Sequence, residues 1–202
     1  MVDDPLAPHL AAHYDLGGER DRLFRDGEPR LELTRTLELL DRFLPPAPAR
    51  LVDVGGGPGA YAAIWARQGY DVHLYDVLER HVEEAQQAAD AQPGHRFTAQ
   101  VADARSIPEP DASADAVVLL GPLYHLTEPT QLVDEVTDAG FDAVSLLGIE
   151  GPGWLMQEHW SDPDRREQML LAARAVESEP TLSGLSSHLL AVGTKPGAVQ
   201  PG

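Results

Sequence analysis

The 202-residue chain contains no cysteine, which excludes disulfides, thiol catalysis and zinc sites built from thiolates. Basic residues are scarce: 15 lysines and arginines stand against 33 aspartates and glutamates, for a formal net charge of -18. Such a charge repels the phosphates of nucleic acids and of anionic membranes. We therefore expect no nucleic-acid partner and no membrane association.

Long hydrophobic runs are missing as well. No apolar segment approaches the roughly 20 residues that a membrane-spanning helix needs. The start Met-Val-Asp-Asp-Pro lacks the basic and then apolar pattern of a signal peptide, so we expect a cytoplasmic protein. The fractions of hydrophobic (43%) and charged (24%) residues are typical of a soluble globular chain, and the length favours one domain.

Strands and helices alternate in the middle of the chain. Apolar strands are expected at 50–54, 72–75, 97–101 and 116–120, with helices at 60–68 and 78–91. This order predicts an α/β fold with a doubly wound, mostly parallel Rossmann-like sheet. Ligands of such sheets bind beyond the carboxyl ends of the strands.

Helical segments are predicted on both sides of this alternation. Leucines at helical spacing predict a helix over 29–44, which Pro45 and Pro46 end. Later, a helix is expected at 130–139. Another is expected to run to about 176, with Asp162 or Ser161 as its cap and Pro163 in its first turn. Strands expected at 141–147 and 187–192 are separated by this long helical insertion, which predicts an antiparallel edge pair.

The clearest sign of a ligand is the run Val52-Asp53-Val54-Gly55-Gly56-Gly57-Pro58-Gly59. Glycine lets the backbone turn sharply and lets a ligand approach the main chain. A helix that begins after such a turn presents free N–H groups to the ligand. The run therefore predicts a site for a nucleotide-like cofactor.

Further features follow the next three predicted strands. Asp76 lies 19 positions after Gly57, close to the ~20 expected of a ribose-binding acid. Asp103 follows the third strand, where it can accept from an exocyclic amine, and Gly121 follows the fourth. Each aspartate alone could equally cap a helix or a turn, but the ordered set favours a cofactor site.

The identity of the cofactor needs a separate argument, because the glycines also fit the dinucleotide pattern G-x-G-x-x-A. Asp53 lies where it can reach an ammonium group, Pro58 stiffens the loop, and Asp103 adds an acid that a pyrophosphate site does not need. These residues predict an adenosine with a cationic amino-acid portion and no phosphates, which is S-adenosylmethionine. An NAD-dependent enzyme is the less favoured alternative.

Residues 52–62 resemble the first motif of class I S-adenosylmethionine-dependent methyltransferases, and Asp76, Asp103 and residues 114–126 resemble the second, third and fourth. Residues 119–126 are similar to a bacterial small-molecule branch of that family, as is the stretch around Tyr14. The resemblance implies a cofactor contact for each of Tyr14, Arg30, Gly55, Gly57, Gly59, Asp76, Val77, Asp103, Ala104, Leu120 and Gly121.

In more detail, the resemblance implies that the three glycines line the methionine portion and that Asp76 holds the ribose. Val77 would lie against the adenine ring, and Asp103 and Ala104 would contact the edge of the adenine. Leu120 and Gly121 would lie beneath the sulfonium. An N-terminal lid would bring Tyr14 and Arg30 near the cofactor.

Methyl transfer gains most from orientation and desolvation, and a general base helps only some acceptors. His125 is the candidate base, and the alternative is a capping or packing role. Tyr14 is a second candidate catalytic residue, which could instead be an ordinary aromatic of the lid. His81, on the second helix, is expected to be a surface or packing residue, and no metal site is expected.

The whole chain is expected to form one methyltransferase-like domain. Its parts are a helical lid (1–48), a cofactor-binding half (49–126), a C-terminal half (127–194) and a tail (195–202). The region of the family's fifth strand is lacking. The last strand could close onto the fourth, a second copy could supply a strand in a homodimer or swap, or residues could be missing from the sequence. Light scattering that showed a strict monomer would exclude the second case.

The predicted function is methyl transfer from S-adenosylmethionine to a small-molecule acceptor. The alternative is a truncated, non-catalytic protein that binds the cofactor or serves as a scaffold. Nothing in the sequence selects the acceptor atom.

Overall fold

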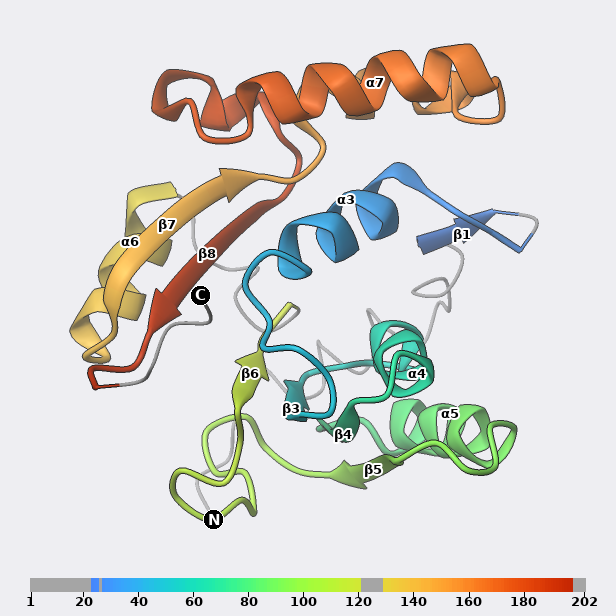
Figure 1. Ribbon diagram of the computed structural model, residues 1–202, viewed down its shortest axis with the longest axis vertical. Coiled ribbons are helices and arrows are strands. Elements are labelled where there is room, and N and C mark those ends of the chain that lie inside the picture. Colours follow the sequence, from blue (N-terminus) through green and yellow to red (C-terminus); the bar gives the residue numbers. More distant parts are fainter. Residues whose placement is uncertain (1–22, 26, 121–128, 198–202) are drawn as a thin grey trace. The chain divides into compact units, whose positions relative to one another are not determined.

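The computed structural model describes residues 23–25, 27–120 and 129–197 (Figure 1). Three predicted site residues, Tyr14, Gly121 and His125, lie outside these ranges. The described residues form two compact units. The first contains residues 45–120, and the second contains residues 23–44, without residue 26, and 129–197.

A four-stranded parallel sheet forms the first unit, which confirms the prediction for this part of the chain. Its order is β5-β4-β3-β6, and β6 is an edge strand among the described residues. The strands are β3 (Arg50–Val54), β4 (Asp71–Asp76), β5 (Phe97–Val101) and β6 (Ala116–Val118).

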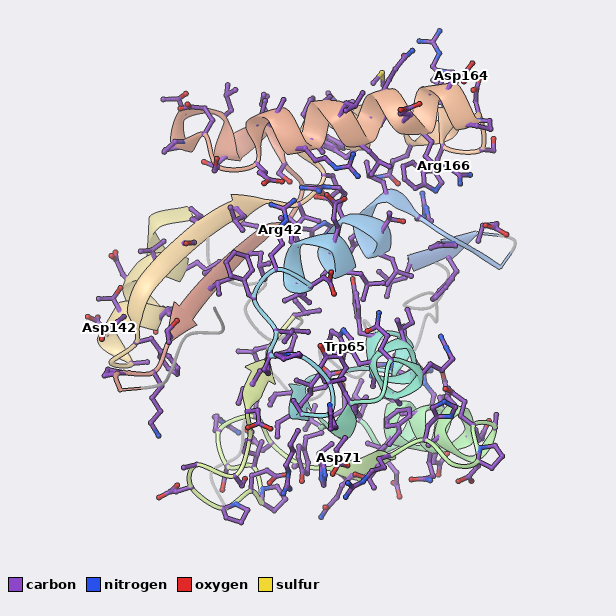
Figure 2. All side chains as sticks on the ribbon, viewed as in Figure 1. Arg42, Trp65, Asp71, Asp142, Asp164 and Arg166 are labelled. Carbon is purple, nitrogen blue, oxygen red and sulfur yellow. The ribbon has the colours of Figure 1, made fainter. Side chains whose placement is uncertain are left out.

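Two helices and a long loop cover this sheet. Helices α4 (Ala60–Arg67) and α5 (Glu79–Asp90) contact each other and pack on β4 and β5. Trp65 of α4, which Figure 2 labels, is almost completely buried. A second cluster of Val52, Val54 and Tyr75 packs against apolar residues of the segment 102–114. The sheet is therefore fixed on both sides around the carboxyl end of β3.

The second unit contains the predicted antiparallel pair, as a two-stranded sheet of its own. Both strands begin one to two residues later than the pattern predicted. The elements of this unit are β1 (Phe24–Arg25), β2 (Glu28–Pro29), α3 (Leu31–Leu40), α6 (Pro129–Asp138), β7 (Asp142–Gly148), η1 (Gly151–His159), α7 (Pro163–Val176), η2 (Pro180–Leu185) and β8 (Leu189–Thr194).

Helix α7 begins where it was predicted, and Asp162, one of the two candidate caps, is its N-cap. The Asp162 carboxylate accepts from the backbone N–H groups of Asp164 and Arg165, and Pro163 occupies the first turn. Arg166, which Figure 2 labels, lies in the same turn, and its guanidinium is 5.1 Å from the ring centroid of Trp160. The indole N–H of Trp160 donates to the carbonyl of Pro29 at 2.7 Å.

Helix α3 belongs to the second unit, where Leu31 packs with Trp160 and Met169. The role of the N-terminal segment as a lid stays a prediction. None of the described helices is long and apolar enough to cross a membrane.

Candidate cofactor site

The glycine loop lies between β3 and α4, as expected. Gly55, Gly57 and Gly59 have φ angles of 69°, 55° and 79°, the left-handed region in which side chains with a Cβ are strained. Gly59 is the N-cap of α4, and as a glycine it has no side chain to cap that helix end. The first turn of α4 therefore presents backbone N–H groups that no cap side chain covers.

Space around the loop differs from one glycine to the next. A Cβ at Gly56 would lie 2.5 Å from Asp53 Oδ2, and one at Gly59 would lie 2.9 Å from the Phe97 ring. At Gly57, by contrast, the nearest described atom to an added Cβ is His81 Nδ1, at 4.0 Å. The loop is thus packed tightly onto the sheet and α5 at Gly56 and Gly59, and at Gly57 it is open as far as residues 23–25, 27–120 and 129–197 are concerned.

Asp76 ends β4 beside this open point. Its Oδ2 accepts from the Gly57 N–H at 2.9 Å, and its Oδ1 accepts from the Leu78 N–H at 2.9 Å. His81 Nδ1 lies 3.3 Å from the same Oδ1. The structure therefore brings Asp76 together with the glycine loop, as expected of residues that share one cofactor site.

These contacts limit what Asp76 can still accept. A carboxylate has about four acceptor positions, and Gly57, Leu78 and His81 occupy three of them. The position that is left belongs to Oδ2. In this arrangement Asp76 can accept directly from one ribose hydroxyl, whereas a contact to both ribose hydroxyls needs His81 to give up its contact.

Asp53 lies on β3 and is almost completely buried. Its Oδ2 has no hydrogen-bond partner among the residues that the structure describes. Burial raises the pKa of this carboxyl, and the neighbouring charge of Asp76 raises it further, to about 7. A buried acceptor atom without a partner fits a cationic ligand group, because such a group would satisfy the oxygen and favour its charged form.

Asp103 follows β5, next to the end of β4, since Val101 pairs with Asp76. The guanidinium of Arg105 binds both carboxylate oxygens of Asp103, at 2.6 to 3.1 Å. This bond holds the pKa of Asp103 at about 2. The carboxylate is charged and half-exposed, and Arg105 is the group with which an adenine amine would compete.

Four other residues were predicted to contact the cofactor, namely Val77, Ala104, Leu120 and Arg30. Val77 is 57% exposed beside Asp76, and Ala104 is also exposed. Leu120 is half-buried just after β6, whose Val118 pairs with Asp53. Arg30 lies in the second unit, where it donates to Gln157 Oε1 at 2.8 Å. The predicted cofactor roles of these residues stay predictions.

Sequence reasoning missed the contact that His81 makes. The side chain is 4% exposed and lies against Asp76 and Gly57, in the first turn of α5. The signal was its place five residues after Asp76, because the first turn of a helix that follows a parallel strand faces the strand's end. Nothing in the residue type itself distinguished a buried partner of Asp76 from a surface histidine.

Comparisons with known proteins agree with this geometry. Residues 52–139 match the family model described as a methyltransferase domain. A 91-residue stretch is 33% identical to an uncharacterized methyltransferase of Mycobacterium sp. (strain JLS) and covers 45% of this chain. That stretch spans 34% of the relative's own length. The predicted resemblance to class I S-adenosylmethionine-dependent methyltransferases is confirmed.

Solved structures share the fold. The [4+2]-cyclase SpnF gives a TM-score of 0.53 at 18% identity, over 82% of this chain and 81% of that one. The PH0226 protein of Pyrococcus horikoshii OT3 gives 0.50 at 19% identity, over 63% and 58%. Phosphoethanolamine N-methyltransferase 1 of Haemonchus contortus gives 0.50 at 17% identity, over 71% and 31%. At such identities the likeness shows the Rossmann-like fold alone.

Proposed function

We propose that this protein transfers a methyl group from S-adenosylmethionine to a small-molecule acceptor. The observation that carries the proposal is the buried Asp53 oxygen, which has no partner in the described part of the chain. It lies next to a glycine loop whose Gly57 amide donates to Asp76. The match of residues 52–139 to a methyltransferase domain supports it.

The residues that are present fit this cofactor. Asp53 would meet its ammonium group, the loop around Gly57 its amino-acid portion, and Asp76 a ribose hydroxyl. Asp103 would meet the adenine amine after displacing Arg105, with Val77 against the ring. The cofactor supplies a methyl group already activated by the sulfonium, so the protein's tasks are to bind, orient and exclude water.

Acid–base chemistry is a smaller part of the proposal. An amine or carbon acceptor that is already nucleophilic needs little help, whereas a hydroxyl gains from a base. His125 and Tyr14 remain the candidates for that role. We expect a small acceptor, because a net charge of -18 disfavours nucleic acids.

A second candidate function is cofactor binding without methyl transfer. Two observations favour it. No strand lies beyond β6 in the described part of the four-stranded sheet, and one of the structures that share the fold is named a [4+2]-cyclase. A fold by itself does not determine which reaction a protein performs.

Calorimetry with S-adenosylmethionine, S-adenosylhomocysteine and NAD tests the proposal. We expect the first two to bind and NAD not to bind. The Asp76→Ala variant should bind about tenfold or more weakly, because it loses a hydrogen bond from the ligand to a charged group. Asp71→Ala is the matched control, since Asp71 is at the opposite end of the same strand (labelled in Figure 2).

The outcomes separate the candidates. Failure of both S-adenosyl compounds to bind would overturn the proposal together with the second candidate. Unchanged affinity in Asp76→Ala would show that the ribose assignment is wrong. Binding without methyl transfer to any member of a panel of amines, phenols, carboxylates and activated carbon acids would favour the second candidate.

A further inference from the structure

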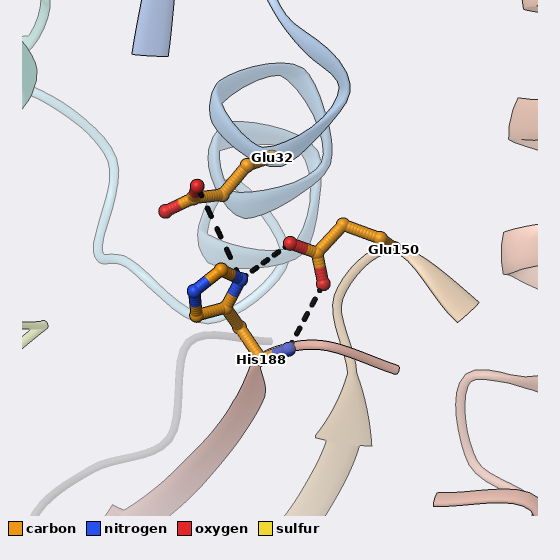
Figure 3. Close-up of side chains that lie close together, drawn as sticks. All are labelled: Glu32, Glu150 and His188. Carbon is orange, nitrogen blue, oxygen red and sulfur yellow. Dashed lines mark hydrogen bonds and ion pairs between the residues drawn. The ribbon is translucent and has the colours of Figure 1, made fainter. Parts of the chain in front are cut away.

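Three segments of the second unit bring metal-ligating side chains together. Glu32 comes from α3, Glu150 follows β7, and His188 precedes β8 (Figure 3). One ligand atom from each lies within 4.8 Å of the other two. We propose that these side chains bind a divalent transition-metal ion of the Zn²⁺ class. The proposal is independent of the proposed function.

The imidazole is the centre of the cluster. His188 Nδ1 is hydrogen-bonded to Glu150 Oε1 and lies 4.0 Å from Glu32 Oε2. Both carboxylates therefore face one ring nitrogen. A proton on that nitrogen can lie between it and one oxygen only, whereas a divalent cation bonds to the nitrogen and to both carboxylates at once.

Burial strengthens the charge interactions within this cluster. The exposed fractions of the side chains are 1% for Glu150, 13% for Glu32 and 29% for His188. Two carboxylates this close repel each other, and the repulsion is stronger where water is largely excluded. A bound divalent ion would compensate both charges.

Outer hydrogen bonds hold Glu150 in a ligand-like orientation, which is a second and independent observation. Its Oε2 accepts from the His188 N–H at 3.1 Å. It also lies 3.0 Å from Ser186 Oγ, whose one proton is shared with the His188 carbonyl at 2.7 Å. Ser186 Oγ in turn accepts from the Glu150 N–H at 3.0 Å. Carboxylates that ligate metals are commonly oriented by such partners, and here they leave Oε1 directed at the imidazole.

The donor set selects the metal. One imidazole nitrogen and two carboxylate oxygens suit Zn²⁺, Mn²⁺, Fe²⁺ or Co²⁺, whereas Ca²⁺ and Mg²⁺ prefer oxygen alone. Ligand atoms about 2.0–2.1 Å from a tetrahedral zinc lie roughly 3.3 Å apart. On binding, Glu32 would therefore move closer to Nδ1 than its present 4.0 Å, and a water molecule would complete the coordination.

Such an ion would act as a cross-link. It would join α3 to the end of β7 and the start of β8, which are more than 100 residues away along the chain. Because binding requires the folded arrangement, the ion stabilises the fold by mass action. The second unit should therefore melt at a higher temperature with metal than without it.

Calorimetry of untagged, chelator-treated protein with ZnCl₂ tests the proposal. We expect one saturable site, weakened about a hundredfold or more in Glu150→Gln and His188→Asn. His159→Asn is the matched control, because His159 is an exposed histidine 3.6 Å from the Glu158 carboxylate. That variant should bind as the wild type does.

Two further measurements do not depend on the buried variants. Glu32→Gln changes the half-buried ligand on α3 and should lose the rise in melting temperature that Zn²⁺ gives the wild type. Co²⁺ bound to the wild-type protein should show the intense visible absorption of a four-coordinate site. Absence of saturable binding, equal binding by all variants, or the weak spectrum of hydrated Co²⁺ would each overturn the proposal.

Discussion

Asp53 is a carboxylic acid that the fold holds in its neutral form more firmly than the unfolded chain does. Burial and the charge of Asp76 raise its pKa from 3.8 to about 7. An acid whose pKa is raised on folding stabilises the fold fully below its unfolded pKa, and this contribution is lost as the pH rises through the folded value. The window for this effect is therefore pH 4 to 7.

Replacement of Asp53 by Asn removes this titration. We expect the free energy of unfolding of the wild type to fall by about 4 kcal/mol relative to Asp53→Asn between pH 4 and 8. Urea unfolding of both proteins across this range measures the difference. Asp111→Asn, at an exposed position, is the control. Parallel pH profiles for the wild type and Asp53→Asn would contradict the assignment.

Helix α3 is held to the rest of the second unit by a buried arginine. Arg35, in the middle of this helix, is completely buried. Its Nε donates to the Ile149 carbonyl at 3.0 Å, and its NH2 bonds to Glu177 Oε2 at 2.6 Å. Its NH1 also lies 2.9 Å from Glu38 Oε1 on the same helix. The two acceptors outside the helix hold it to the segments that follow β7 and α7.

Arg35→Met keeps the length of the side chain but leaves both acceptors without this donor. We expect a loss of about 2 to 3 kcal/mol in the free energy of unfolding, since hydrogen bonds to charged groups contribute about that much. Arg42→Met is the control, because Arg42 bonds to the same Glu177 from a position 40% exposed (labelled in Figure 2). Its loss should stay below about 1 kcal/mol. If urea unfolding gave equal losses of free energy for Arg35→Met and Arg42→Met, burial of Arg35 would add nothing to the stability of the fold.

At the scale of the whole molecule, the excess of acidic residues dominates. A net charge of -18 on 202 residues makes the folded chain repel itself. Salt shortens the range of this repulsion, because the Debye length falls from about 30 Å at 0.01 M to about 8 Å at 0.15 M.

We therefore expect the melting temperature to rise when NaCl is raised from about 0.01 to 0.15 M. KCl should act in the same way, since the effect is one of screening and not of a specific ion. Calorimetric melting at constant pH measures it. A melting temperature that falls with salt would show that ion pairs outweigh the overall repulsion.

The sequence by itself determined the first unit in some detail. The strands at β3, β4 and β5 and the turn through Gly55 and Gly59 follow from residues that are neighbours in the chain. Because carboxyl ends of adjacent parallel strands meet at one edge, the approach of Asp76 to Gly57 could be predicted as well. The same local patterns predicted the cap of α7 and the antiparallel pair.

Only the tertiary structure decided what depends on burial and on distant partners. The raised pKa of Asp53 and the burial of Arg35 have no local pattern. The meeting of Glu32 with Glu150 and His188 joins residues more than 100 positions apart. The physical reason is that periodicity and turn residues specify elements locally, whereas solvent exclusion and long-range charge contacts arise only when the elements pack.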